Sequence, residues 1–127
     1  MLKSLSKVLI LLSMLTTARV ATASELEAAT VVTAESTQGK RLKLVLPEFP
    51  VTKRVKDVSI CAEPGTVVTV AKLWMPGMGH GSAPTQLAPG VDGCTTVSNV
   101  QFIMRGAWQI LVTLQDGDTG VFDVTVE

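Results

Sequence analysis

Histidine, cysteine and aromatic residues are scarce in this chain. Its 127 residues include one histidine, two cysteines, two tryptophans, three phenylalanines and no tyrosine. A Ser-His-Asp triad would have to recruit His80 from a glycine-rich segment, and no serine stands in a nucleophile-elbow motif. A zinc hydrolase needs several histidine or acidic ligands in a defined pattern, which the sequence does not supply. We therefore expect that the protein is not an enzyme.

The chain also lacks an excess of positive charge. It contains eleven basic and eleven acidic residues, and three of the basic ones, Lys3, Lys7 and Arg19, fall in the first 23 residues, which contain no acid. The remainder is mildly acidic, with a net charge near −3. No basic patch with interleaved aromatic residues is available to bind phosphates, so we expect no nucleic-acid partner.

The first 23 residues have the pattern of a secretory signal peptide. Met1–Lys7 carries two lysines, Val8–Leu15 is apolar apart from Ser13, and Ala21-Thr22-Ala23 offers the small residues that a signal peptidase accepts. The apolar run is short for a membrane span. We expect cleavage after Ala23, a periplasmic or secreted protein, and no transmembrane segment after cleavage.

The remaining residues suffice for one domain with one core. Residues 24–40 are polar and rich in alanine and threonine, so they are expected to form a flexible leader, or a frayed first element, before a domain at 41–127. That domain shows short β-branched runs separated by turn residues, and no helical periodicity. The expected strand regions are Arg41–Leu46, two short pieces in Val51–Cys61, Thr66–Met75, Thr95–Met104, Trp108–Leu114 and Gly120–Val126. This pattern predicts an all-β, immunoglobulin-like antiparallel β-sandwich of about seven strands.

Strand faces and connections follow from the same pattern. In Thr66–Met75, strict alternation places Val68, Val70 and Trp74 on one face and Val67, Leu73 and Met75 on the other. The glycine- and proline-rich segment 77–93 is expected to be a long loop. The sequence Asp-Gly-Asp at 116–118 predicts a hairpin before the last strand.

The two cysteines, Cys61 and Cys94, are expected to form a structural disulfide. An isolated pair in an oxidising compartment usually does so, and the sequence has no Cys-x-x-Cys motif to indicate redox catalysis. A thiolate metal site or a redox couple is the alternative. The bridge would close a ring around the segment that carries His80.

That segment, Trp74-Met75-Pro76-Gly77-Met78-Gly79-His80-Gly81-Ser82, is the candidate functional site. It combines the only histidine with two of the five methionines, and thioether sulfur with imidazole nitrogen suits the soft cation Cu(I). Met75, Met78 and His80 are the candidate ligands, and Met104 is a further one. The competing interpretation is structural, because Met75 ends an apolar strand and Met104 lies two residues after Phe102.

From about Leu44 to Glu127 the chain resembles the YtkA-like and FixH-like family of small exported or membrane-tethered domains. The resemblance rests on Leu73–Gly81, on Phe102-Ile103-Met104-Arg105-Gly106-Ala107-Trp108-Gln109-Ile110 and on Phe122-Asp123-Val124-Thr125-Val126. It implies an immunoglobulin-like sandwich in the bacterial envelope, without an established catalytic activity, and is the reason for grouping Met104 with the other three ligands. The two cysteines are not part of the family pattern.

Together these features predict a periplasmic Cu(I)-binding accessory or chaperone domain. Its partner is expected to be a copper-dependent protein or a membrane complex. The alternative is a protein-interaction module that binds no metal, or an assembly accessory of an envelope complex. Convergence of Met75, Met78 and His80 at a solvent-reachable point would favour metal, whereas a buried Met75 with His80 pointing away would favour the interaction module.

Overall fold

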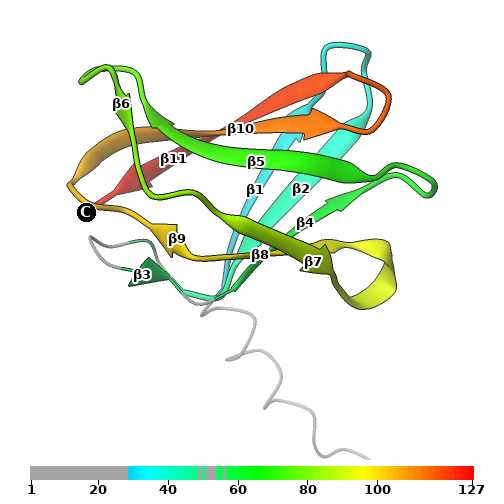
Figure 1. Cartoon of the computed structure of the whole chain (residues 1–127), viewed down its shortest axis with the longest axis horizontal. Coiled ribbons are helices and arrows are strands. Elements are labelled where there is room, and N and C mark those ends of the chain that lie inside the picture. Colours follow the sequence, from blue (N-terminus) through cyan, green and yellow to red (C-terminus); the bar gives the residue numbers. More distant parts are fainter. Residues whose placement is uncertain (1–28, 49, 51–53, 56) are drawn as a thin grey trace, which may run out of the picture.

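The computed structural model describes residues 29–48, 50, 54, 55 and 57–127, and these form an antiparallel β-structure (Figure 1). The predicted signal peptide at 1–23 lies outside the described residues. The strands are β1 (Thr30–Glu35), β2 (Arg41–Leu46), β3 (Arg54–Val55), β4 (Val58–Ala62), β5 (Val68–Met75), β6 (His80–Gly81), β7 (Gln86–Pro89), β8 (Thr95–Ser98), β9 (Val100–Gln101), β10 (Gly106–Leu114) and β11 (Thr119–Val126), with one 3-10 turn at Val91–Gly93.

The strand order confirms the predicted immunoglobulin-like sandwich. One sheet has the order β1-β2-β4-β8-β7 and the other β11-β10-β5-β6, while β3 and β9 form a small separate pair. The order β2-β4-β8-β7 corresponds to the A-B-E-D sheet of an immunoglobulin fold, and β11-β10-β5 corresponds to G-F-C. The strand β6 takes the place of C′, and β1 extends the first sheet beyond strand A.

The core lies between the two sheets and follows the alternation of the longest strands. In β11, Phe122, Val124 and Val126 are buried while the residues between them are exposed, as the sequence predicted. In β10, the buried positions begin at Trp108 and continue on alternate residues to Leu114. Trp108 is 1% exposed and packs edge-to-face on Phe102, with ring centroids 5.7 Å apart. The turn at 116–118 joins the two strands, as expected.

The predicted face of Val68 is wrong, because β5 contains a bulge. Thr113 of β10 pairs with Val70, but the next residue, Leu114, pairs with Val68, so Thr69 is an extra residue. An extra residue reverses the alternation locally. Val68 is therefore buried with Ala71, Leu73 and Met75, and not on the outer face with Val70 and Trp74. Val67, predicted to share the face of Leu73 and Met75, is instead 47% exposed.

Two segments expected to be irregular contain strands. Residues 30–35 of the expected leader form β1, which pairs in continuous register with β2 from Thr30↔Leu46 to Glu35↔Arg41. The expected loop at 77–93 contains β6 and β7, and β7 pairs with β8. In both cases an edge strand gains its hydrogen bonds from a neighbour, so weak local propensity does not prevent it from forming.

The disulfide forms as predicted, within one sheet. The S–S distance is 2.06 Å between Cys61 on β4 and Cys94, which immediately precedes β8. Because Ile60 pairs with Thr95, these cysteines are the next opposed pair along the two strands, at a Cα–Cα distance of 4.2 Å. Antibody domains instead bridge B to F, with a tryptophan on strand C against the bridge. Here the buried tryptophan, Trp108, is on the F-like strand.

A disulfide is compatible with a location outside the cytoplasm. In the part of the chain that the structure describes, no helix is long and apolar enough to cross a membrane.

Candidate functional site

The four predicted metal ligands lie on the β5–β6 hairpin and on the segment that leads into β10. Met75 is the last residue of β5 and pairs with His80, the first residue of β6. The Met75 carbonyl accepts hydrogen bonds from the amides of Met78 (3.1 Å) and Gly79 (2.9 Å). Gly79 has φ +68°, a left-handed conformation that glycine adopts without steric cost. The local sequence thus closes a four-residue turn that places Met75 opposite His80.

His80 is half-buried, and one of its ring nitrogens has a backbone partner. Its Nδ1 lies 3.0 Å from the carbonyl oxygen of Gly81. A carbonyl can only accept, so the neutral ring carries its proton on Nδ1 and leaves the Nε2 lone pair available. The ring also packs edge-on against Trp108, at 6.2 Å between centroids and 69° between planes. The hairpin and the indole therefore fix the orientation of the imidazole.

The methionines occupy three different environments. Met75 is 5% exposed and belongs to the core, and a Cβ at Gly106 would lie 2.6 Å from its Cε. Met78, at the tip of the turn, is 57% exposed. Met104 is half-buried against the core, and its carbonyl accepts a 2.8 Å hydrogen bond from the Trp108 Nε1–H.

Trp108 therefore connects two of the predicted ligands, since it contacts the ring of His80 and the backbone of Met104. Met75 packs in the core, as the interpretation without a metal predicted, and Met78 projects to solvent. The second tryptophan, Trp74, is half-buried outside the core, with the Lys72 ammonium 5.7 Å from its ring centroid.

Three features of this site were not predicted from the sequence. The Gly81 carbonyl and the Trp108 edge contact depend on tertiary geometry and have no local signal. The third feature is the need for glycine at position 106. The φ angle of Gly106 is +129°, and the Met75 side chain occupies the space where a Cβ would lie. A glycine at the start of a strand was a usable signal, because it often marks a close approach.

The donor chemistry depends on methionine. Among residues 29–48, 50, 54, 55 and 57–127, no group of three or more histidine, cysteine, aspartate or glutamate side chains could hold a metal ion. Both cysteines are consumed by the disulfide. A metal at the hairpin would therefore bind to thioethers and one imidazole, a set that fits Cu(I) and disfavours hard cations such as Ca²⁺.

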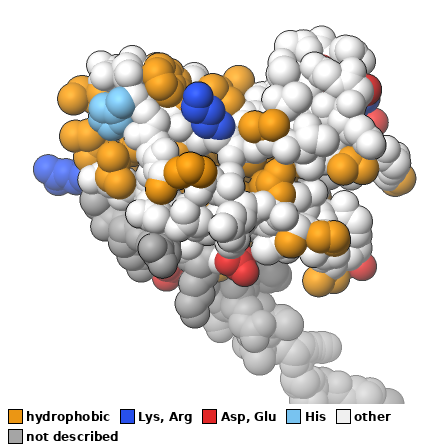
Figure 2. Space-filling view, in the orientation of Figure 1, with side chains coloured by type: hydrophobic (Ala, Val, Ile, Leu, Met, Phe, Trp, Pro, Cys, Tyr) orange, Lys and Arg blue, Asp and Glu red, His pale blue; other side chains and the backbone are white. Residues whose placement is uncertain are grey.

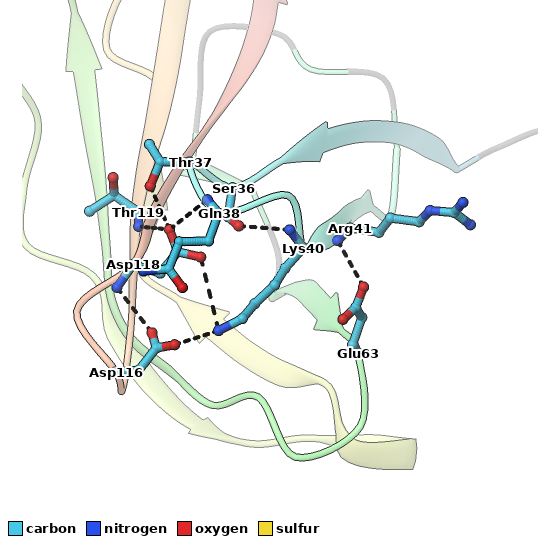
Figure 3. A network of polar contacts seen from close by, with 9 residues as sticks. All are labelled: Ser36, Thr37, Gln38, Lys40, Arg41, Glu63, Asp116, Asp118 and Thr119. Carbon is cyan, nitrogen blue, oxygen red and sulfur yellow. Dashed lines mark hydrogen bonds and ion pairs between the residues drawn. The ribbon is translucent and has the colours of Figure 1, made fainter.

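A polar cluster lies at the opposite ends of β5 and β10 (Figure 3). Asp118 is 2% exposed, and its Oδ1 accepts hydrogen bonds from the Thr37 hydroxyl (2.6 Å) and from the amides of Gln38 (3.2 Å) and Thr119 (2.8 Å). Lys40 pairs with Asp116, and its Nζ lies 3.9 Å from Asp118 Oδ2. These contacts tie the β1–β2 turn to the β10–β11 turn, so the cluster is structural.

Acid should weaken this cluster. Burial raises the pKa of Asp118, but the hydroxyls of Ser36 and Thr37 and the Thr119 and Gln38 amides outweigh it, and the pKa falls below 3.8. A carboxylate with a lowered pKa in the folded state stabilises the fold above its unfolded pKa and loses that effect as pH falls through the folded value. We expect the free energy of unfolding to decrease from about pH 5 downward.

The measurement is urea unfolding between neutral and acidic pH for the wild type and for Asp118→Asn. The variant should be less stable at neutral pH and should lose less stability on acidification. Asp123→Asn, an exposed position on the neighbouring strand β11, is the control and should follow the wild type. Parallel acid profiles for wild type and Asp118→Asn would contradict the assignment.

No protein-family model, curated protein or solved structure matches this chain.

Proposed function

We propose that the protein binds Cu(I) at the β5–β6 hairpin. The observation that carries this proposal is the 3.0 Å contact from His80 Nδ1 to the Gly81 carbonyl. Histidines that bind metal through one nitrogen usually donate the other N–H to a carbonyl or carboxylate, which holds the ring and its tautomer. His80 has this arrangement with a backbone carbonyl as the partner of Nδ1, and its Nε2 is the nitrogen left for a metal.

The thioethers of the same region would complete the ligand set. Met78 is exposed on the turn that His80 closes, and Met104 is attached through its backbone to the indole that His80 contacts. Cu(I) accepts two to four soft ligands in undemanding geometry, so a glycine-containing turn can adjust around it. Met75 lies beneath the hairpin in the core, and its sulfur would serve as the innermost ligand.

The test is a Cu(I) competition titration of the protein from Ser24 to Glu127, with the disulfide confirmed intact. We expect one-to-one binding that falls by more than about 100-fold in a Met78→Leu/His80→Ala variant, since loss of direct ligands should exceed the 10–100-fold effect of second-shell changes. Single Met75→Leu and Met104→Leu variants then assign the remaining sulfurs.

An Ile103→Leu variant is the matched control, because Ile103 is exposed like Met78 and precedes Met104 in the chain, but offers no donor atom. It should bind like the wild type. Equal, weak binding by the wild type and the double variant would exclude a copper site at this hairpin.

We further propose a periplasmic or secreted accessory or chaperone role for a copper-dependent protein or membrane complex. The disulfide supports an extracytoplasmic location. The strand order and the Met-Pro-Gly-Met-Gly-His turn between the C-like and C′-like strands support membership of the YtkA-like and FixH-like domains. Fractionation of the native host, with the site of signal cleavage determined by mass spectrometry, tests the location.

The burial of Met75 favours the second candidate, an interaction module without metal. A methionine that fills the core beside Gly106 is explained without any ligand role. The exposed Met78 would then be a contact residue for a protein partner. The copper titration separates the two functions, because only the first predicts loss of metal binding in the double variant.

A further inference from the structure

Two clefts along β5 are not part of the Met/His hairpin. The first has a volume of about 350 Å³ and lies between β5 and the segment that leads into β7; the second, of about 370 Å³, lies between the start of β5 and the β7–β8 connection. The first is lined by Thr69–Leu73, Ser82–Thr85 and Leu87, and the second by Thr66–Val68, Ala88–Gly90 and Gly93–Thr95.

The clefts exist because the second sheet is incomplete on this side. The strand β6 is two residues long and pairs only with Trp74 and Met75 of β5. Beyond that point the chain leaves the sheet for β7 and is attached to β5 by the Thr85 hydroxyl, which donates to the Ala71 carbonyl at 2.5 Å. Along the rest of β5, no described strand pairs with the edge that faces β7.

The surface of the clefts is largely apolar. Val67 and Val70 are 47% and 46% exposed, and Leu87, Pro84 and Pro89 add further apolar surface from the opposite wall. Figure 2 shows hydrophobic side chains spread over β5 and β7 on this face. Exposed apolar surface collected in concave sites is typical of binding surfaces.

One charge accompanies the clefts. Among the described residues that line them, Lys72 is the only ionisable side chain, and no acidic side chain is present. Its ammonium lies 5.7 Å from the Trp74 ring centroid, so the indole orients it without neutralising it. A ligand that places a carboxylate at this end would meet an unopposed positive charge.

We propose that this face binds an extended segment of a partner protein, with apolar side chains in the two clefts and an acidic side chain at Lys72. On β5 and the residues just before it, the first cleft is lined around Ala71 and the second around Val67. These positions are four residues apart, or up to about 13 Å at the rise of a regular strand. An extended chain covers that distance between residues i and i+4, and alternate side chains then point to the same surface. The in-line arrangement and the single charge distinguish this ligand from a small molecule, which would fill one cleft.

This inference goes beyond the proposed copper binding and does not depend on it, because none of the four candidate copper ligands lines either cleft. Its test uses metal-free, disulfide-intact protein from Ser24 to Glu127. A display library of random dodecapeptides is selected on this protein, and the enriched peptides are synthesised for affinity measurement. We expect them to share two apolar residues at i and i+4 and an acidic residue.

The binding surface is then identified with single variants. Val67→Asp and Val70→Asp should each weaken binding of the synthetic peptide at least tenfold, and Lys72→Glu should do the same and be rescued by a lysine in place of the acid of the peptide. Val121→Asp on β11 (41% exposed) and Lys43→Glu on β2 are the matched controls and should bind like the wild type. Circular dichroism confirms that each variant is folded.

Several results would overturn the inference. They are no enrichment above a protein-free support, loss of binding in the Val121→Asp control, or dependence on only one cleft. Binding that instead requires Met78 or His80 would transfer the partner to the hairpin and refute a site on β5. Each of these outcomes is independent of the copper titration.

Discussion

Replacing Trp108 with alanine is expected to lower the free energy of unfolding by about 3–5 kcal/mol, the range for aromatic residues removed from a packed core. Trp108 is 1% exposed, packs on Phe102 and donates its Nε1–H to the Met104 carbonyl. The change leaves a cavity and an unpaired backbone acceptor at the same point. Guanidinium unfolding followed by circular dichroism measures the loss.

Trp74→Ala is the matched control, because it removes the other tryptophan from the outer face of the neighbouring strand. Trp74 is half-buried and outside the core cluster, so its loss should cost clearly less than that of Trp108. Similar losses for the two variants would contradict the assignment of the core. Because Trp108 also contacts His80, Trp108→Ala should weaken Cu(I) binding in the titration as well.

Removing the disulfide with a Cys61→Ser/Cys94→Ser variant is expected to cost about 3–4 kcal/mol, mainly because the unfolded chain is no longer cross-linked. The two cysteines are 33 positions apart, and the ring that they close includes the β5–β6 hairpin and every cleft-lining residue except Thr95. For a small domain this is a large share of the total stability. Denaturant unfolding at neutral pH measures the difference.

The wild type treated with a reductant is the control for this pair, since it loses the same cross-link without a change of sequence. Its free energy of unfolding should match that of the double-serine variant. A loss well below about 3–4 kcal/mol in both samples would contradict this prediction. It would mean that the reduced, unfolded chain is already restricted by residual structure, so that the cross-link adds little.

The strands that alternate cleanly were predictable. In β11 and in β10 from Trp108 onward, apolar residues at every second position face the core, and the Asp-Gly-Asp turn joins the two strands. A period of two is a property of an extended chain packed on one side, so it can be read locally. The pairing of the two cysteines followed from their number and the expected compartment.

The strands that depend on a neighbour were not predictable in the same way. β1 and β7 have weak patterns of their own and exist because β2 and β8 satisfy their backbone groups. The bulge at Thr69 reverses the face of Val68 for a reason that lies in the register with β10. No window of local sequence contains that information.

By itself, the sequence determined the all-β class, the main strands, the disulfide and the presence of soft donor atoms around His80, because composition, spacing and alternation act locally. Only the tertiary structure decided where those donors lie. It buried Met75 against Gly106 and exposed Met78. It also brought the His80 ring and the Met104 backbone into contact with Trp108, and the Gly81 carbonyl holds the imidazole. It also left one edge of β5 without a paired strand over most of its length, since β6 is two residues long and pairs only with Trp74 and Met75. Burial and hydrogen bonding between distant segments depend on how the two sheets pack, and packing is a property of the whole fold.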